Sequence, residues 1–159
     1  KLAGDREELG VYKVDEDAGE LQLLGIVSPK DEGFNTNIEY SSPVPVLKFP
    51  LEKGASWQAS VEASGTLEST GVTPLNYDAT YSTEVDAKGE LKTPYGTFEV
   101  LRISTVLEQE GAVSGATFGT VRTFAFVAEC FGTVAMIRSE KGESNKEFET
   151  AAEIRRLTR

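Results

Sequence analysis

The sequence contains no histidine, and its only cysteine is Cys130. The absence of histidine excludes Ser-His and Cys-His nucleophile pairs, histidine general bases and zinc sites that contain histidine. A single thiol can form neither an intramolecular disulfide nor a thiolate metal cluster, and it is compatible with an oxidising or a reducing compartment. No glycine-rich loop that would cradle a phosphate opens a helix. We therefore expect no metal site and no cofactor.

Long apolar runs and basic runs are also missing. No stretch approaches the roughly 18 consecutive apolar residues of a membrane-spanning helix. The formal charge is −10, from 26 acidic and 16 basic residues, and no run of Lys or Arg offsets it. Such a surface repels phosphate backbones and anionic lipid head groups. We therefore expect no transmembrane segment and no nucleic-acid partner.

Alternating apolar and polar residues are what the sequence has in abundance. From Trp57 to Leu67 the odd-numbered positions are apolar or small, while the even-numbered positions between them are polar, and the pattern returns from Leu75 to Ala87. A period of two is typical of strands with one buried and one wet face, as in antiparallel sheets. The sequence predicts an all-β protein, an antiparallel meander of about eight to ten strands. We expect this sheet to be strongly curled or partly closed into a barrel, with little helix.

The length is that of one domain with its own core, residues 1–159. Residues 1–50 predict an N-terminal hairpin, with Gly19 at positive φ in its turn, and then an irregular edge segment from Ser28 to Pro50, because prolines cannot donate to a ladder. Residues 51–159 predict the main antiparallel sheet. Within it we expect turns at Asp86–Gly89 and Pro94–Thr97, a tight connection ending at Gly132, and a last strand that includes Phe148 and Ile154.

Three aromatic residues are the candidates for ligand binding: Trp57, Tyr77 and Tyr81. They share the predicted inward face of two strands with small residues. Large and small side chains on one face either pack into a solid core or leave a concave apolar cavity if the sheet curls without closing. We favour core packing and keep the cavity as the alternative. The small residues on this face are Ala59, Ala63, Gly65 and Ala79.

Cys130 and the carboxylates are the candidates for chemistry. Nothing near Cys130 in the sequence would lower its pKa, so we expect a small buried thiol at a turn rather than a nucleophile. Asp15, Asp17 and Gly19 suggest a calcium loop, but the further ligand positions and the terminal Glu of that loop are missing, so we favour an ordinary turn. A hydrolase that uses two carboxylates remains an alternative, because the sequence contains several neighbouring acidic residues. The neighbouring acidic pairs are Glu7 and Glu8, Glu16 and Asp17, and Asp31 and Glu32.

Three phrases carry a family resemblance over about residues 49–134: FPLEKGASW at 49–57, TPYGTF at 93–98 and FVAECFGTV at 126–134. In this order the chain resembles a broad group of bacterial exported or lipid-anchored β-rich proteins with no assigned activity. Glu129 and Cys130 stand where the group's third phrase has Pro-Gly. The resemblance implies an antiparallel β-fold in the periplasm or anchored to the cell envelope.

We expect a non-enzymatic cell-envelope domain. Its partner would be either an apolar small molecule in a concave sheet or an envelope protein that the domain supports in a complex. The alternative is the hydrolase that uses paired carboxylates.

Overall fold

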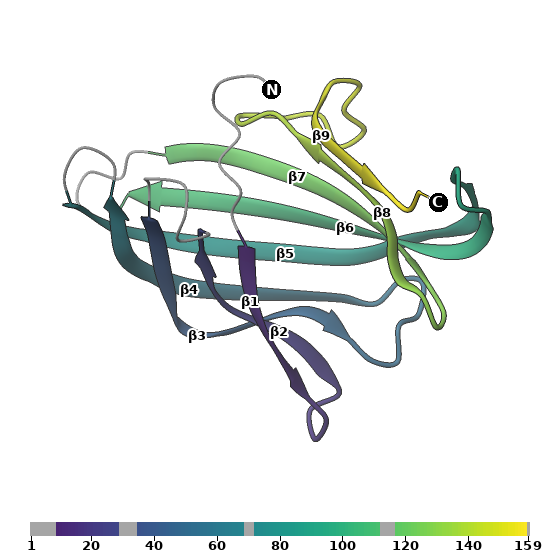
Figure 1. Cartoon of the computed structure of the whole chain (residues 1–159), viewed down its shortest axis with the longest axis horizontal. Coiled ribbons are helices and arrows are strands. Elements are labelled where there is room, and N and C mark those ends of the chain that lie inside the picture. The colour runs from purple at the N-terminus through teal and green to yellow at the C-terminus, as the bar shows by residue number, and fades with distance from the viewer. Residues whose placement is uncertain (1–8, 29–34, 69–71, 112–116, 159) are drawn as a thin grey trace.

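The computed structural model describes residues 9–28, 35–68, 72–111 and 117–158, and these form nine antiparallel strands with no helix (Figure 1). Accordingly, the described part of the chain contains no helix able to cross a membrane. The strands are β1 (Leu9–Asp15), β2 (Glu20–Val27), β3 (Asn35–Lys48), β4 (Ser56–Glu68), β5 (Val72–Lys92), β6 (Thr97–Gly111), β7 (Thr117–Ala128), β8 (Gly132–Ser139) and β9 (Ala151–Arg156).

One sheet contains all nine strands, and their order in space follows their order in the sequence, with β1 and β9 at its two edges. Every pair is antiparallel, and β4 pairs with β5 without a register shift, so that Trp57 lies opposite Thr83 and Ala63 opposite Tyr77. The sheet curls strongly into a half-barrel (Figure 1). This confirms the prediction of a curled antiparallel meander.

The main core lies on the inner face of the curl. Val61 and Ala63 of β4 are buried there with Tyr77 and Ala79 of β5, while Glu62 between them is exposed. A sheet with no covering layer can bury one face only by curling that face onto itself, because each strand must find apolar neighbours on other strands of the same sheet. Strands β2 and β3 complete this core with Leu23, Ile38 and Val44.

A second, smaller core lies on the opposite face of the sheet. Phe98 and Val100 of β6 have the opposite parity to the inward-facing Ile103, so their side chains project to the outer side. They pack with Ala128 and Val134 of the β7–β8 hairpin. Both faces of β6 are therefore apolar near this end, as its sequence indicates.

The prediction of an irregular edge segment from Ser28 to Pro50 was wrong. Residues 35–48 form β3, an interior strand between β2 and β4. Strand β3 pairs with β4 only as far as Tyr40, and Pro43 and Pro45 follow after that point. The missing N–H of a proline removes no hydrogen bond to β4 there, because the β3–β4 pairing has ended. On the other side, Pro45 pairs with Gln22 of β2 next to a register shift, where the ladder is already irregular.

The predicted turn at Asp86–Gly89 was also wrong, since β5 continues through it to Lys92. The β5–β6 register shifts between Val85 and Ala87, so a bulge accommodates the extra residue, and Gly89 pairs with Val100. The chain reverses a few residues later, at 93–96, where the Thr93 and Gly96 backbones bond each other.

Two predicted turns were confirmed. Gly19 has φ 65° in the β1–β2 turn, and Gly132 has φ 71° where β8 begins. The final segment is a strand that contains Ile154, but the prediction that it includes Phe148 was wrong, because the strand begins only at Ala151. Phe148 lies before it and stacks on Phe124 of β7, with ring centroids 5.2 Å apart.

Candidate functional site

The predicted ligand-binding aromatics lie on β4 and β5 and have partners within the fold. Tyr77 is 8% exposed in the main core. The hydroxyls of Tyr81 and Tyr40 lie 2.7 Å apart, and burial raises the pKa of Tyr81 to about 12. Trp57 donates its indole N–H to the carbonyl of Pro45, 2.8 Å away. The three side chains thus contribute to packing between β3, β4 and β5, and their role in ligand binding stays a prediction.

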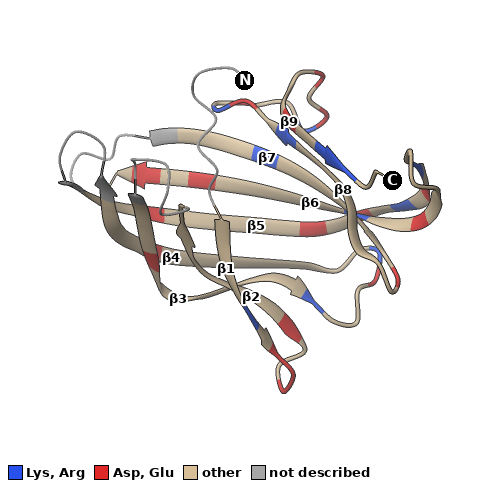
Figure 2. Cartoon of the chain, viewed as in Figure 1, with Lys and Arg blue, Asp and Glu red and all other residues tan. Residues whose placement is uncertain are grey.

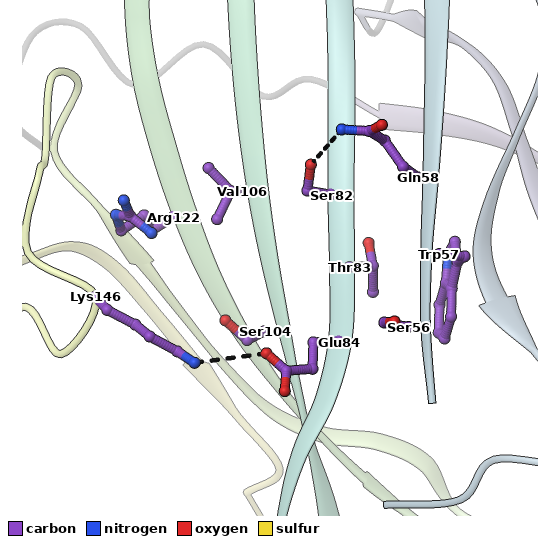
Figure 3. A pocket seen from close by; sticks show the side chains of 10 residues that line it. All are labelled: Ser56, Trp57, Gln58, Ser82, Thr83, Glu84, Ser104, Val106, Arg122 and Lys146. Atoms are coloured by element: carbon purple, nitrogen blue, oxygen red, sulfur yellow. Dashed lines mark hydrogen bonds and ion pairs between the residues drawn. The ribbon is translucent and has the colours of Figure 1, made fainter. Parts of the chain in front are cut away.

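One groove that Trp57 lines crosses β4 to β7, and most of the other residues that line it have polar side chains (Figure 3). Gln58 Nε2 donates to Ser82 Oγ at 3.0 Å, and Lys146 Nζ lies 3.5 Å from Glu84 Oε2. Arg122 donates its Nε–H to the carbonyl of Glu143, 3.1 Å away. The contacts of Lys146 and Arg122 hold the segment 140–150 against the sheet, whereas the Gln58–Ser82 bond joins β4 to β5.

Arg102 of β6 forms ion pairs with Asp86 of β5 and with Glu147 of the segment 140–150. Arg102 Nε and Nη2 donate to the two carboxylate oxygens of Asp86 at 2.8 and 2.9 Å, and Glu147 accepts two further bonds at 2.9 and 3.0 Å. The guanidinium carbon lies 4.4 Å from the centroid of the Phe124 ring. The hydrogen bonds to Asp86 and then to Glu147 raise the pKa of Arg102. This cluster ties β5 and β6 to the segment that precedes β9, and both of its carboxylates are engaged by the guanidinium.

A larger pocket, of about 710 Å³, lies at one end of the half-barrel. We call it the end pocket. Its wall combines the end of β3 and the segment after it, the β5–β6 pairing before the hairpin turn, and the β7–β8 turn. The lining residues are Leu47, Phe49, Leu51, Glu52, Lys53, Lys88, Glu99, Val100, Leu101, Val127, Ala128, Glu129, Cys130 and Gly132.

Backbone hydrogen bonds hold the segment after β3 in place. The Phe49 N–H donates to the carbonyl of Gly19 in the β1–β2 turn at 2.8 Å. Further along, the Gly54 N–H donates to the Val85 carbonyl at 2.8 Å, and the Val85 N–H donates back to Ala55 at 2.9 Å. The apolar side chains of this segment are therefore carried by a fixed backbone, which is what a preformed binding pocket requires.

Charge at the end pocket is mixed. Two lysines, Lys53 and Lys88, line it with three glutamates, Glu52, Glu99 and Glu129. A ligand there would meet an apolar wall made by leucine, valine and phenylalanine, with both signs of charge beside it. This arrangement fits an apolar body with a small polar group and offers no concentrated charge for a phosphate or a metal ion.

Cys130 is exposed, which corrects the expectation of a buried thiol. It has φ 62° in the β7–β8 turn, a left-handed conformation that glycine adopts most easily. Cys130 also lines the end pocket.

The acidic candidates do not converge. Glu16 and Asp17 are exposed in the β1–β2 turn. Asp15 accepts the Ala18 N–H at 3.0 Å and pairs with Lys13 at 3.1 Å, and these hydrogen bonds, that of Ala18 first, lower the pKa of Asp15. The carboxylate thus caps an ordinary turn, as the sequence indicates. The remaining pairs, Glu7 with Glu8 and Asp31 with Glu32, lie outside the described residues.

Comparison with known proteins adds no assignment: no family model, curated protein or solved structure matches this chain.

Proposed function

We propose that the chain is a non-enzymatic domain of the bacterial cell envelope that holds an apolar small molecule in the end pocket. The observation that carries the proposal is this pocket of about 710 Å³, in which half of the fourteen lining residues are aliphatic or aromatic. Small-molecule sites are typically concave, mostly apolar and a few hundred to about 1,000 Å³ in volume. The family resemblance supports the envelope location.

Binding is favoured over hydrolysis by the positions of the carboxylates. Hydrolysis by two carboxylates needs both groups on either side of one bond, about 5 to 10 Å apart in a cleft. The pair Glu16 and Asp17 lies exposed on a turn, and Asp86 is engaged by Arg102. The glutamates at the end pocket accompany lysines beside an apolar wall, which suits the polar end of a ligand.

An uncharged apolar fluorophore tests the proposal directly. N-phenyl-1-naphthylamine fluoresces when it leaves water, so titration into the full chain should give a saturable rise in emission. Replacing Leu51 with glutamine removes one apolar wall, and a loss of about 1 to 2 kcal/mol should weaken binding roughly five- to thirtyfold.

The matched control is Ile154→Gln, because Ile154 is an exposed apolar residue on β9 and does not line the end pocket. We expect its affinity to equal that of the unmodified chain. Native mass spectrometry of gently purified protein would identify a retained apolar ligand. Non-saturable binding, or equal affinity for Leu51→Gln and the unmodified chain, would rule out the end pocket as the site.

A further inference from the structure

Strand β1 is an edge of the sheet and exposes apolar side chains on both of its faces. Within the described part of the chain it pairs only with β2, so no second strand lies along its other side. Tyr12 lies opposite Leu23 of the main core, so even-numbered side chains of β1 project to the inner face and odd-numbered ones to the outer face. The exposed apolar residues are Leu9, Val11, Tyr12 and Val14, at 45%, 40%, 55% and 67%.

The two edges of the sheet differ in how they are protected from further pairing. Natural edge strands commonly carry charged side chains or proline, which discourage another strand from adding. Half of β9 is charged, with Glu153, Arg155 and Arg156 among its six residues. Strand β1 has no proline, and its two charged residues, Lys13 and Asp15, pair with each other at 3.1 Å (Figure 2). β1 is therefore the edge that is open to another strand.

Charge limits where two copies of this chain can meet. Each copy carries a formal charge of −10, so two copies repel each other unless their contact lies where charge is low. The seven residues of β1 contain one lysine and one aspartate and have a formal charge of zero. A seam along β1 thus adds no charge repulsion of its own.

A twofold axis through Tyr12 makes β1 complementary to itself. Around such an axis two copies pair antiparallel with their inner faces on the same side, and Val14 of one copy lies opposite Gly10 of the other. The Tyr12 ring lies over Gly10, because a Cβ added to Gly10 would lie 2.6 Å from Tyr12 Cε2. Val14 would therefore meet an aromatic ring, and pairs of aromatic and β-branched side chains stabilise antiparallel sheets. The symmetry forms this contact twice.

We propose that the chain associates with a second copy through β1, in an antiparallel pair that is centred on Tyr12 and spans residues 9–15 of both copies. The pair joins the two nine-stranded sheets edge to edge. A seven-residue edge buries less than the roughly 800 Å² per partner of a standard interface, so the dimer is weak, with a dissociation constant in the micromolar range or above. Added salt should strengthen it, because salt screens the repulsion between the two acidic copies.

Disulfide crosslinking tests both the pairing and its register. Only a residue on the twofold axis lies directly opposite itself, with Cβ atoms about 4.5 to 5.5 Å apart, close to the reach of a disulfide. Cys130→Ser with Tyr12→Cys, oxidised with copper phenanthroline, should therefore give a covalent dimer in non-reducing electrophoresis. The matched control is Cys130→Ser with Leu9→Cys. Leu9 is also exposed, but its two copies would lie about 20 Å apart, so no dimer should form.

Sedimentation equilibrium of charged variants is the second test. Tyr12→Lys and Tyr12→Glu each place like charges opposite one another at the axis, so each should weaken self-association about tenfold or more. An equal mixture of the two should associate more tightly than either variant alone, because opposite charges then face each other. A variant that misfolds would not regain association on mixing. Ile154→Lys, which adds a charge at an exposed apolar residue of β9, should leave self-association unchanged.

Three results would overturn the proposal: a chain that stays monomeric up to about 1 mM, equal crosslinking at Leu9 and Tyr12, or a loss of association in Ile154→Lys as large as in the Tyr12 variants. The outcome is independent of the proposed function, because no residue of β1 lines the end pocket. A monomer that binds the fluorophore loses the dimer proposal alone, and a dimer that does not bind it loses the end-pocket proposal alone.

Discussion

Replacing Arg102 with methionine removes the cation of the Asp86 pair and keeps an unbranched apolar side chain over the Phe124 ring. The Asp86 carboxylate is only 6% exposed and accepts two hydrogen bonds from Arg102. Losing one partner of a buried pair typically costs 3 to 5 kcal/mol, and because Arg102 itself is a quarter exposed we expect about 2 to 3 kcal/mol. For a domain of this size that lowers the unfolding midpoint by about 4 to 12 °C.

Chemical unfolding followed by tryptophan fluorescence measures this free energy, because Trp57 is the only tryptophan. Asp86→Asn combined with Arg102→Met should recover part of the loss, because no buried charge is then left alone. Glu147→Gln should cost at most about 1 kcal/mol, since that carboxylate is largely exposed. If the free energy of unfolding of Arg102→Met lay within about 0.5 kcal/mol of that of the unmodified chain, the Arg102–Asp86 pair would not stabilise the fold.

Three further predictions concern the sheet. Gly65→Ala should lower the free energy of unfolding in urea by about 2 kcal/mol or more, because the added carbon would lie 1.9 Å from the carbonyl oxygen of Asn37. Gly89→Ala is the control: the added carbon would meet open space, so the free energy of unfolding should change by less than about 0.5 kcal/mol. Ile103→Val should cost about 0.5 to 1.5 kcal/mol, because Ile103 is fully enclosed. Burial raises the pKa of Tyr81 to about 12, above the ordinary value of about 10, so its contribution is complete below pH 10 and lost between pH 10 and 12. The free energy of unfolding should therefore fall more steeply over that range for the unmodified chain than for Tyr81→Phe.

The strands with regular alternation were predictable from the sequence. From Trp57 to Thr66 and from Leu75 to Val85, each residue's face follows from its own position, because the inward side chains meet apolar neighbours on adjacent strands that repeat the same period. The antiparallel sheet and its curl follow from such strands, because a sheet that no second layer covers can bury its apolar face only against itself.

Local signals failed where a distant partner decides the structure. Pro43 and Pro45 suggest an irregular edge, yet β3 tolerates them because its pairing with β4 has already ended at Tyr40. The residues around Gly89 have the composition of a turn, yet a bulge and the Arg102 ion pair keep β5 extended. The residues around the prolines do not reveal where the β3–β4 pairing ends, and the residues around Gly89 do not reveal the ion pair with Arg102.

The end pocket was harder to predict than the core, because four separate segments build it. The signal in the sequence was the placement of two large apolar residues, Phe49 and Leu51, in the segment after β3. Alternation instead pointed to Trp57, Tyr77 and Tyr81, which pack between strands. Cys130 was misplaced because its burial depends on the left-handed turn, which residue composition alone does not indicate.

Photo-crosslinking can show whether an apolar molecule occupies the end pocket. A long-chain alcohol carrying a diazirine, irradiated with the full chain and mapped by peptide mass spectrometry, should label residues within 47–53, 99–101 and 127–132, and excess unlabelled alcohol should compete. Labelling spread over β1 and β9, or labelling that excess alcohol does not reduce, would contradict it.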